Sequence, residues 1–142
     1  MRAGFMIGRI VLGLYYLITA ITDLMNYKML AGYAASKGVP APEAAVIVAH
    51  LLLLLAGFCF LTGWRPALGV AAIVVFLIPV SFTMHAFWAE KTAQMKQMQL
   101  INFTKNMGLL GSALMFLGIP RPWPYSVESG AAAAPSRRTV SP

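Results

Sequence analysis

Two long stretches without a charged side chain constrain this sequence most. Residues 66–89 and residues 44–64 contain no Asp, Glu, Lys or Arg over 24 and 21 consecutive positions. A helix needs about 20 mostly apolar residues to cross the roughly 30 Å of hydrocarbon in a bilayer. The chain of 142 residues is 59% apolar and 11% charged, whereas soluble proteins average about 45–50% and about 25%. The sequence therefore predicts an integral membrane protein and argues against a soluble enzyme, a disordered regulator or a nucleic-acid-binding module.

Four segments are long enough to span a bilayer, so the predicted fold class is all-α: an antiparallel bundle of four transmembrane helices within residues 1–119. The predicted helices cover residues 4–24, 44–64, 66–88 and 99–119. A short turn around Gly63 joins the second helix to the third, which makes these two an antiparallel hairpin. Arg9 interrupts the first apolar run and no small-x-small cleavage site is present, so we expect that segment to be a retained helix.

Two segments outside the predicted helices are candidates for contact with partner subunits. The stretch 25–42 favours a short amphipathic turn at the membrane interface, formed by Tyr27, Met29, Leu30 and Tyr33. The tail 120–142 contains five prolines, an alanine run and two adjacent arginines, and it has no helical period. We expect this tail to be flexible or held by a partner.

The basic residues predict both a lipid-bound surface and an orientation. The net charge is +7, but the positive charges stand singly between apolar runs, which fits anionic lipid better than nucleic acid. Four crossings place both termini and the Arg65 turn on one side, with six basic residues against five on the other. This excess favours termini in the cytoplasm, in a bacterial inner membrane.

Following the chain through four crossings places most of its polar side chains in one half of the bilayer. His50 lies seven residues into its helix, about 10 Å deep at 1.5 Å per residue. Ionisable and amide groups at such depth usually face a bundle interior, where they pair or line a ligand site. The candidate ligand-binding cluster consists of Asp23, His50, His85, Trp88, Lys105 and Asn106.

Most members of this cluster also have an explanation without function. His85, Trp88 and Lys105 lie near helix ends, where aromatic belts and snorkelling account for such residues. Asp23 can pair with a lysine on its own side, and Asn106 can form a hydrogen bond between helices. The convergence of the whole group favours a site more strongly than any single member.

The sequence gives little support to a haem or metal site. His50 and His85 on adjacent helices suggest bis-histidine haem, but their depths differ by a turn or more and no other haem signature accompanies them. No carboxylate or cysteine joins the histidines at metal-ligand spacing, and Cys59 is most simply a small buried hydrophobe. We therefore expect no metal and no intrinsic cofactor. We also recognise no nucleophile–base pair in the sequence, which argues against catalysis by this chain alone.

A series of short motifs resembles, in order, those of the DoxX family of small four-helix membrane proteins. The matching motifs run from about residue 8 to residue 118 and include Gly8-Arg9, Gly38-Val39-Pro40, the Leu61–Arg65 turn, His85-Ala86-Phe87-Trp88 and Phe103-Thr104-Lys105-Asn106. Many relatives have a glutamate just before the glycine pair of the second helix, where this chain has Leu53–Gly57. The nearest polar group here is His50, one turn earlier.

The resemblance implies a subunit of a membrane oxidoreductase assembly, such as quinol-oxidase or thiosulfate:quinone oxidoreductase systems, with His85 and Asn106 as the matched site positions. We therefore predict an accessory or quinone-interacting subunit of a larger electron-transfer complex, with quinone as its ligand. Two alternatives remain open. One is a purely structural subunit without a ligand, and the other, less favoured, is a quinone oxidoreductase that acts alone.

Overall fold

The protein is all-helical over residues 2–129, the part of the chain that the computed structural model describes. This confirms the predicted fold class. The α-helices are α1 (Arg2–Met25), α2 (Tyr27–Ser36), α3 (Pro42–Thr62), α4 (Pro66–Thr83) and α5 (Ala93–Met115), and the 3₁₀ turns are η1 (Phe87–Ala89) and η2 (Phe116–Gly118).

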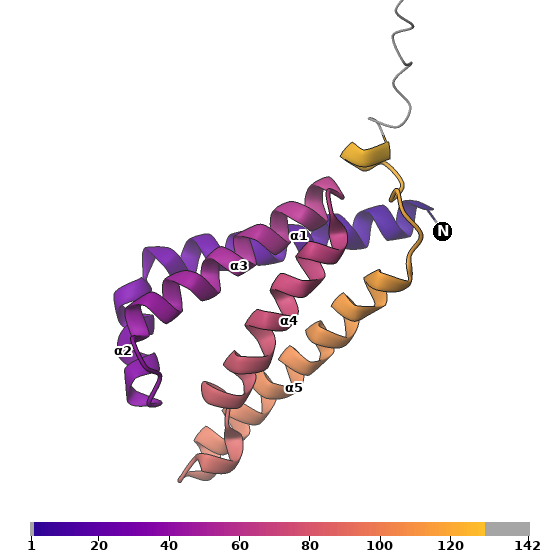
Figure 1. Cartoon of the computed structure of the whole chain (residues 1–142). Helices are drawn as coiled ribbons and strands as arrows, with labels where there is room; N and C mark the ends of the chain where they lie inside the picture. The colour runs from indigo at the N-terminus through magenta and orange to yellow at the C-terminus, as the bar shows by residue number, and fades with distance from the viewer. Residues whose placement is uncertain (1, 130–142) are drawn as a thin grey trace, which may run out of the picture.

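The long helices form two pairs that diverge like the arms of a V (Figure 1). α1 packs along α3, α4 packs along α5, and the two arms meet where α3 turns into α4. The short α2 lies against α3 near the open end of the V. The space between the arms is therefore bounded by α2 at one end and by the α3–α4 turn at the other.

Local sequence signals set the sharp turn at the apex of the V. Gly63 ends α3 in the left-handed conformation (φ +68°), and its N–H donates to the Cys59 carbonyl, a typical glycine C-cap. Pro66 then occupies the first turn of α4, where its missing N–H costs no hydrogen bond. The antiparallel hairpin expected from this short connection is present.

Glycine residues let the helices approach closely in two places. A Cβ at Gly57 of α3 would lie 2.9 Å from the Gly13 carbonyl oxygen of α1 and 2.7 Å from Leu17. At the apex, a Cβ on Gly69 of α4 would lie 2.8 Å from the Cβ of Cys59 on α3. These distances are below van der Waals contact, so glycine permits the close crossing of α1 with α3 and of α3 with α4.

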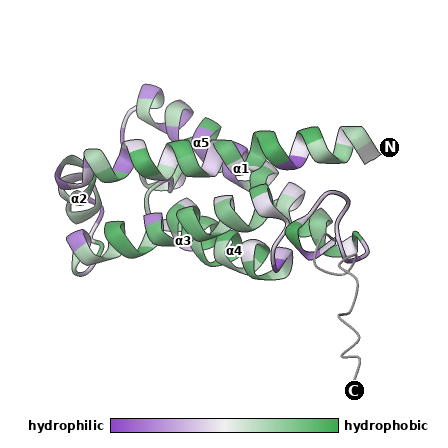
Figure 2. Cartoon of the chain, turned by 90° about the horizontal axis from the view of Figure 1, so that it is seen from above, coloured by the Kyte–Doolittle hydropathy of each residue, from purple (hydrophilic) through white to green (hydrophobic). Residues whose placement is uncertain are grey.

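Within the described residues 2–129, three segments are long and apolar enough to cross a membrane: Ala3–Met25, Pro42–Thr62 and Pro66–Ala89. They coincide with the first three predicted spans, although α4 itself ends at Thr83 and a turn precedes η1. The fourth predicted span falls on α5, which begins at Ala93 rather than at residue 99. Hydrophobic residues cover most of α1, α3 and α4, while hydrophilic ones gather on α2 and at helix ends (Figure 2).

The stretch 25–42 differs from the short turn that the sequence predicted. Residues Tyr27–Ser36 form a ten-residue helix, α2, with Ala31 and Ala34 buried against α3. The two alanines lie three residues apart and so occupy the same face of the helix. α2 is therefore packed onto the bundle instead of lying apart from it at the interface.

The first ten residues of the predicted flexible tail also pack onto the bundle, whereas residues 130–142 lie outside the described residues. Trp123 is 1% exposed and contacts the rings of Phe5, Phe60 and Phe116. Burial of an aromatic side chain this large stabilises the fold more than a free tail would. The packed domain thus extends beyond residue 119.

A buried arginine holds this segment in place. Arg9, 3% exposed on α1, donates hydrogen bonds to the carbonyls of Pro124 (3.4 Å) and Tyr125 (3.1 Å). Glu128 accepts hydrogen bonds from the backbone N–H of Arg65 and from the Arg121 side chain, and these bonds lower the pKa of its carboxyl. Two of the guanidinium nitrogens of Arg9 are therefore bonded to backbone carbonyls of residues 120–129, while its buried Nε has no partner within residues 2–129.

The close α1–α3 crossing gives a direct test of the packing. We expect Gly57→Ala to lower the stability in detergent by about 1–3 kcal/mol, because the Gly13 carbonyl cannot move aside without shifting the backbone of α1. Thermal unfolding followed by circular dichroism measures this. The matched control is Gly108→Ala on α5, where no atom lies within 4 Å of the new Cβ and where the change should stabilise the helix. A Gly57→Ala protein at least as stable as the control would contradict the described crossing.

Candidate functional site

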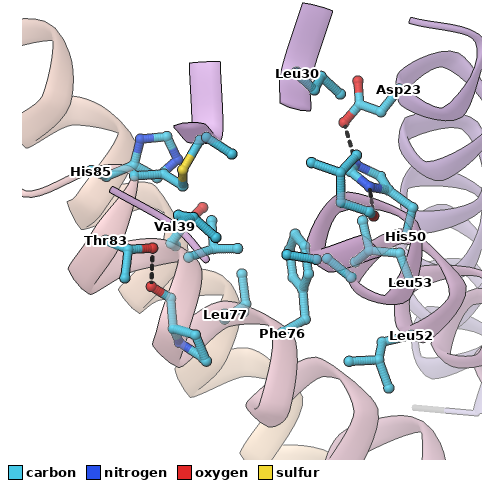
Figure 3. A pocket seen from close by; sticks show the side chains of 18 of the residues that line it. Asp23, Leu30, Val39, His50, Leu52, Leu53, Phe76, Leu77, Thr83 and His85 are labelled. Atoms are coloured by element: carbon cyan, nitrogen blue, oxygen red, sulfur yellow. Dashed lines mark hydrogen bonds and ion pairs between the residues drawn. The ribbon is translucent and has the colours of Figure 1, made fainter. Parts of the chain in front are cut away.

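A cavity of about 580 Å³ lies between the two arms of the V, on the side of α2. Most of its wall is apolar, from residues such as Leu53, Phe76 and Leu77, and a few polar side chains project into it (Figure 3). We call this space the central cavity. Its polar lining residues are Tyr15, Tyr16, Thr19, Asp23, Tyr33, Lys37, His50, Thr83, His85, Lys105 and Asn106.

One wall of the central cavity presents a histidine–aspartate pair. His50 is 7% exposed on α3, and its Nε2 lies 3.0 Å from Oδ2 of Asp23, which ends α1. Its Nδ1 lies 2.7 Å from the Val46 carbonyl oxygen one turn earlier. Because a carbonyl only accepts, Nδ1 must donate its hydrogen there.

His50 thus joins α3 to the last turn of α1 through its contact with Asp23. Both ring nitrogens of His50 are engaged, so neither is free to ligate a metal ion in this arrangement.

The opposite wall contains a second histidine held by an amide (Figure 3). Nδ1 of His85 donates to the Gln99 side-chain oxygen at 2.8 Å, and the Gln99 amide donates to the Tyr33 hydroxyl at 2.7 Å. The Tyr33 hydroxyl in turn donates to the Met84 carbonyl at 3.4 Å. This chain of hydrogen bonds joins α2, α5 and the end of α4, and it fixes the orientation of the His85 ring.

An ion pair reinforces the same junction at the membrane surface. The ammonium of Lys37, at the end of α2, contacts the carboxylate of Glu90, which follows η1. This hydrogen bond raises the pKa of Lys37, so the lysine stays charged over the physiological range. Together with the Tyr33 contacts, the pair covers the end of the central cavity that faces water.

A third feature of the cavity is a buried hydroxyl group that has no hydrogen-bond partner within residues 2–129. Tyr16 is 1% exposed, and its buried hydroxyl has no hydrogen-bond partner among residues 2–129. Asn106 is 6% exposed and also lines the cavity. Lys105 is exposed beside it, with a weak 3.4 Å contact to Asn102. A buried hydroxyl without a partner costs about 1–3 kcal/mol, which makes it a natural place for a ligand atom.

The structure thus brings five of the six predicted site residues to one cavity: Asp23, His50, His85, Lys105 and Asn106. Trp88 does not line it. Trp88 is 52% exposed and packs with Phe82, Phe87 and Phe103 on an outer face of α4 and α5. An aromatic residue at this level is typical of a membrane interface, which accounts for it without a ligand.

The sequence analysis missed three residues of the site: Tyr16 and Tyr33, which line the cavity, and Gln99, which holds His85. Heptad spacing was a usable signal for two of them. Tyr16 lies seven residues from both Arg9 and Asp23, and Gln99 lies seven residues before Asn106, so each shares a helix face with a predicted polar residue. Tyr33 was assigned to the interface because α2 was not expected to pack inward. Its contacts with α4 and α5 had no signal in the sequence.

The central cavity combines apolar walls with a few oriented polar side chains. Two histidines face each other across apolar walls, and both are oriented by second partners (Figure 3). Pockets of about 300–1,000 Å³ with apolar walls and a few fixed polar groups are typical of small-molecule sites. Within residues 2–129, no three His, Cys, Asp or Glu side chains are grouped so as to hold a metal ion.

Comparisons with known proteins agree with the membrane character of the chain. The inner membrane protein YphA of Escherichia coli (strain K12) is 25% identical over 123 residues, which is 87% of this chain and 86% of that protein. No solved structure matches the chain significantly. The DoxX family model matches residues 4–86, more than half of the chain. With its three apolar segments of membrane-spanning length, the chain is an integral membrane protein that belongs to the DoxX family.

Proposed function

We propose that this protein binds the head group of a membrane quinone in its central cavity, as an accessory subunit of a larger electron-transfer complex. Tyr16 carries this proposal, because the residue lines the central cavity and its buried hydroxyl has no partner among residues 2–129. A ligand with a hydrogen-bond acceptor at this point would satisfy the hydroxyl. The carbonyl oxygen of a quinone ring is such an acceptor.

The shape of the cavity supports a ring with polar atoms on opposite edges. The apolar surfaces of Leu53, Phe76 and Leu77 suit the two faces of a flat ring, and a 1,4-quinone presents one carbonyl at each end. His85 and the His50–Asp23 pair lie on opposite walls. Asn106 adds an amide donor on the α5 side.

The His50–Asp23 pair supports a role in handling protons. A bound quinone supplies redox chemistry in which two electrons and two protons are taken up or released together. The Asp23 side chain is 38% exposed while that of His50 is 9% exposed, so the pair joins the membrane surface to the cavity interior. Chains of Asp, Glu and His side chains form the proton relays of membrane pumps and transporters. Electrons pass through a partner subunit in this proposal.

The location that we propose is a bacterial inner membrane with both termini in the cytoplasm. The relative YphA is named as an inner membrane protein, and its similarity extends over most of both chains. The described basic residues at the terminal end, Arg9, Arg65 and Arg121, fit the preference of such residues for the cytoplasmic side. Protease protection of a C-terminal tag in oriented vesicles tests this orientation.

Quinone content of the purified protein tests the proposed ligand. We expect protein purified in mild detergent to contain quinone that organic extraction releases, and we expect Asn106→Leu to lose most of it. Leucine has nearly the shape of asparagine but donates no hydrogen bond to the ligand. Asn102→Leu, one turn earlier on α5 and outside the cavity lining, should retain the wild-type amount. A wild-type protein free of quinone, even after incubation with it, would instead favour a purely structural subunit.

Tyr16→Phe separates a ligand-binding role of Tyr16 from a structural one. Removing a buried hydroxyl that has no partner should raise the stability of the ligand-free protein by about 1 kcal/mol. The same change should weaken quinone binding about five- to tenfold, because the ligand loses one hydrogen bond. Thermal unfolding and equilibrium binding measure the two effects, with Tyr27→Phe on α2 as the control outside the cavity. Unchanged binding in Tyr16→Phe would remove the main support for the proposal.

A further inference from the structure

The central cavity opens sideways between α3 and α4. Val48 of α3 and Val75 of α4 both line the cavity, yet they are 56% and 58% exposed. Leu52 lies one turn from Val48, and Pro79 lies one turn from Val75, so each helix contributes an apolar stripe to one edge of the opening. We call these four residues the lateral rim.

The lateral rim lies at the depth of the hydrocarbon. Val48 is six residues from the start of α3, about 9 Å along the helix, and Val75 is eight residues from the end of α4, about 12 Å along it. Both helices belong to segments of membrane-spanning length and composition. A slot at this depth faces lipid chains rather than water.

The other boundaries of the cavity differ from the lateral rim. At the end that faces water, α2 closes over the cavity through the Tyr33 contacts and the Lys37–Glu90 ion pair. On the side between α1 and α5, the lining includes Asp23, exposed Lys105 and the phenol of Tyr15. The residues that line the α3–α4 side are therefore apolar, like the neighbouring cavity wall around Phe76. We take this side as the exit for an apolar group.

The geometry points to a ligand with a long hydrocarbon tail, whose polar ring sits among the histidines and whose tail leaves between Val48 and Val75 into the bilayer. This inference rests on the proposed quinone head-group site and adds the route: the quinone enters from the membrane between α3 and α4, past Val48 and Val75. A bulky side chain on the lateral rim would then obstruct the tail without touching the site of the ring.

Two quinones and a pair of matched variants test this inference. The probes are a 1,4-benzoquinone with a decyl chain and the same ring without the chain, titrated against purified protein. We expect Val75→Trp to weaken binding of the decyl quinone about tenfold or more, a typical effect of overfilling a packed space. Binding of the tailless ring should stay within about twofold, since the head-group site is unaltered. Ile78→Trp, 44% exposed on the same helix but outside the cavity lining, should change neither affinity.

A second pair of variants keeps the test valid if Val75→Trp fails to fold. Val48→Trp approaches the slot from α3 and should repeat the selective loss, with the neighbouring Ile47→Trp, which is outside the lining, as its control. If the rim variants weaken both quinones equally, or weaken neither, the tail does not leave by this route and the inference is overturned. If neither quinone binds the wild-type protein, the head-group site itself is wrong and both proposals fall.

Discussion

The divergence of the two helix pairs is the constraint on which the site depends. At the apex, the absence of a side chain at Gly69 lets α4 meet α3 at Cys59, and at the other end α2 packs against the α1–α3 arm. Tyr33 and Lys37 fix α2 to the opposite arm by hydrogen bonds and an ion pair. Parallel arms would pack their side chains together and leave no cavity. The V shape therefore gives a small bundle an internal cavity.

The low polarity of the surroundings explains why the polar groups occur as connected sets. A polar side chain in hydrocarbon costs several kcal/mol unless it is paired, so isolated groups are rare there. Two nitrogens of Arg9 bond to carbonyls of residues 120–129, His50 bonds to Asp23, and His85 bonds to Gln99. Four buried side-chain atoms within residues 2–129 have no partner: Arg9 Nε, the Tyr16 hydroxyl, Ser81 Oγ and Trp123 Nε1. Of these four residues Tyr16 belongs to the lining of the central cavity, which makes its hydroxyl the one of interest for a ligand.

Much of this organisation could be predicted from the sequence because membrane depth follows from chain position. Counting along apolar runs placed Asp23, His50, His85 and Asn106 in one half of the bilayer, and the structure brings them to one cavity. Helix depth alone does not give rotation, which is why Trp88 was included although it faces outward. The packing of α2 and of Trp123 depends on contacts between distant segments, for which the local sequence pattern contains no signal. The V shape likewise arises from one close crossing and not from any repeat.

The two histidines of the chain make possible a direct test of the shared site. Protein labelled with nitrogen-15 at histidine gives side-chain NMR signals from His50 and His85 alone, and His85→Asn assigns them. We predict that a tailless 1,4-benzoquinone shifts the signals of both rings over the same concentration range, because one ligand lies between them. Signals that do not move, or of which only one moves, would contradict a head-group site between the two walls of the cavity.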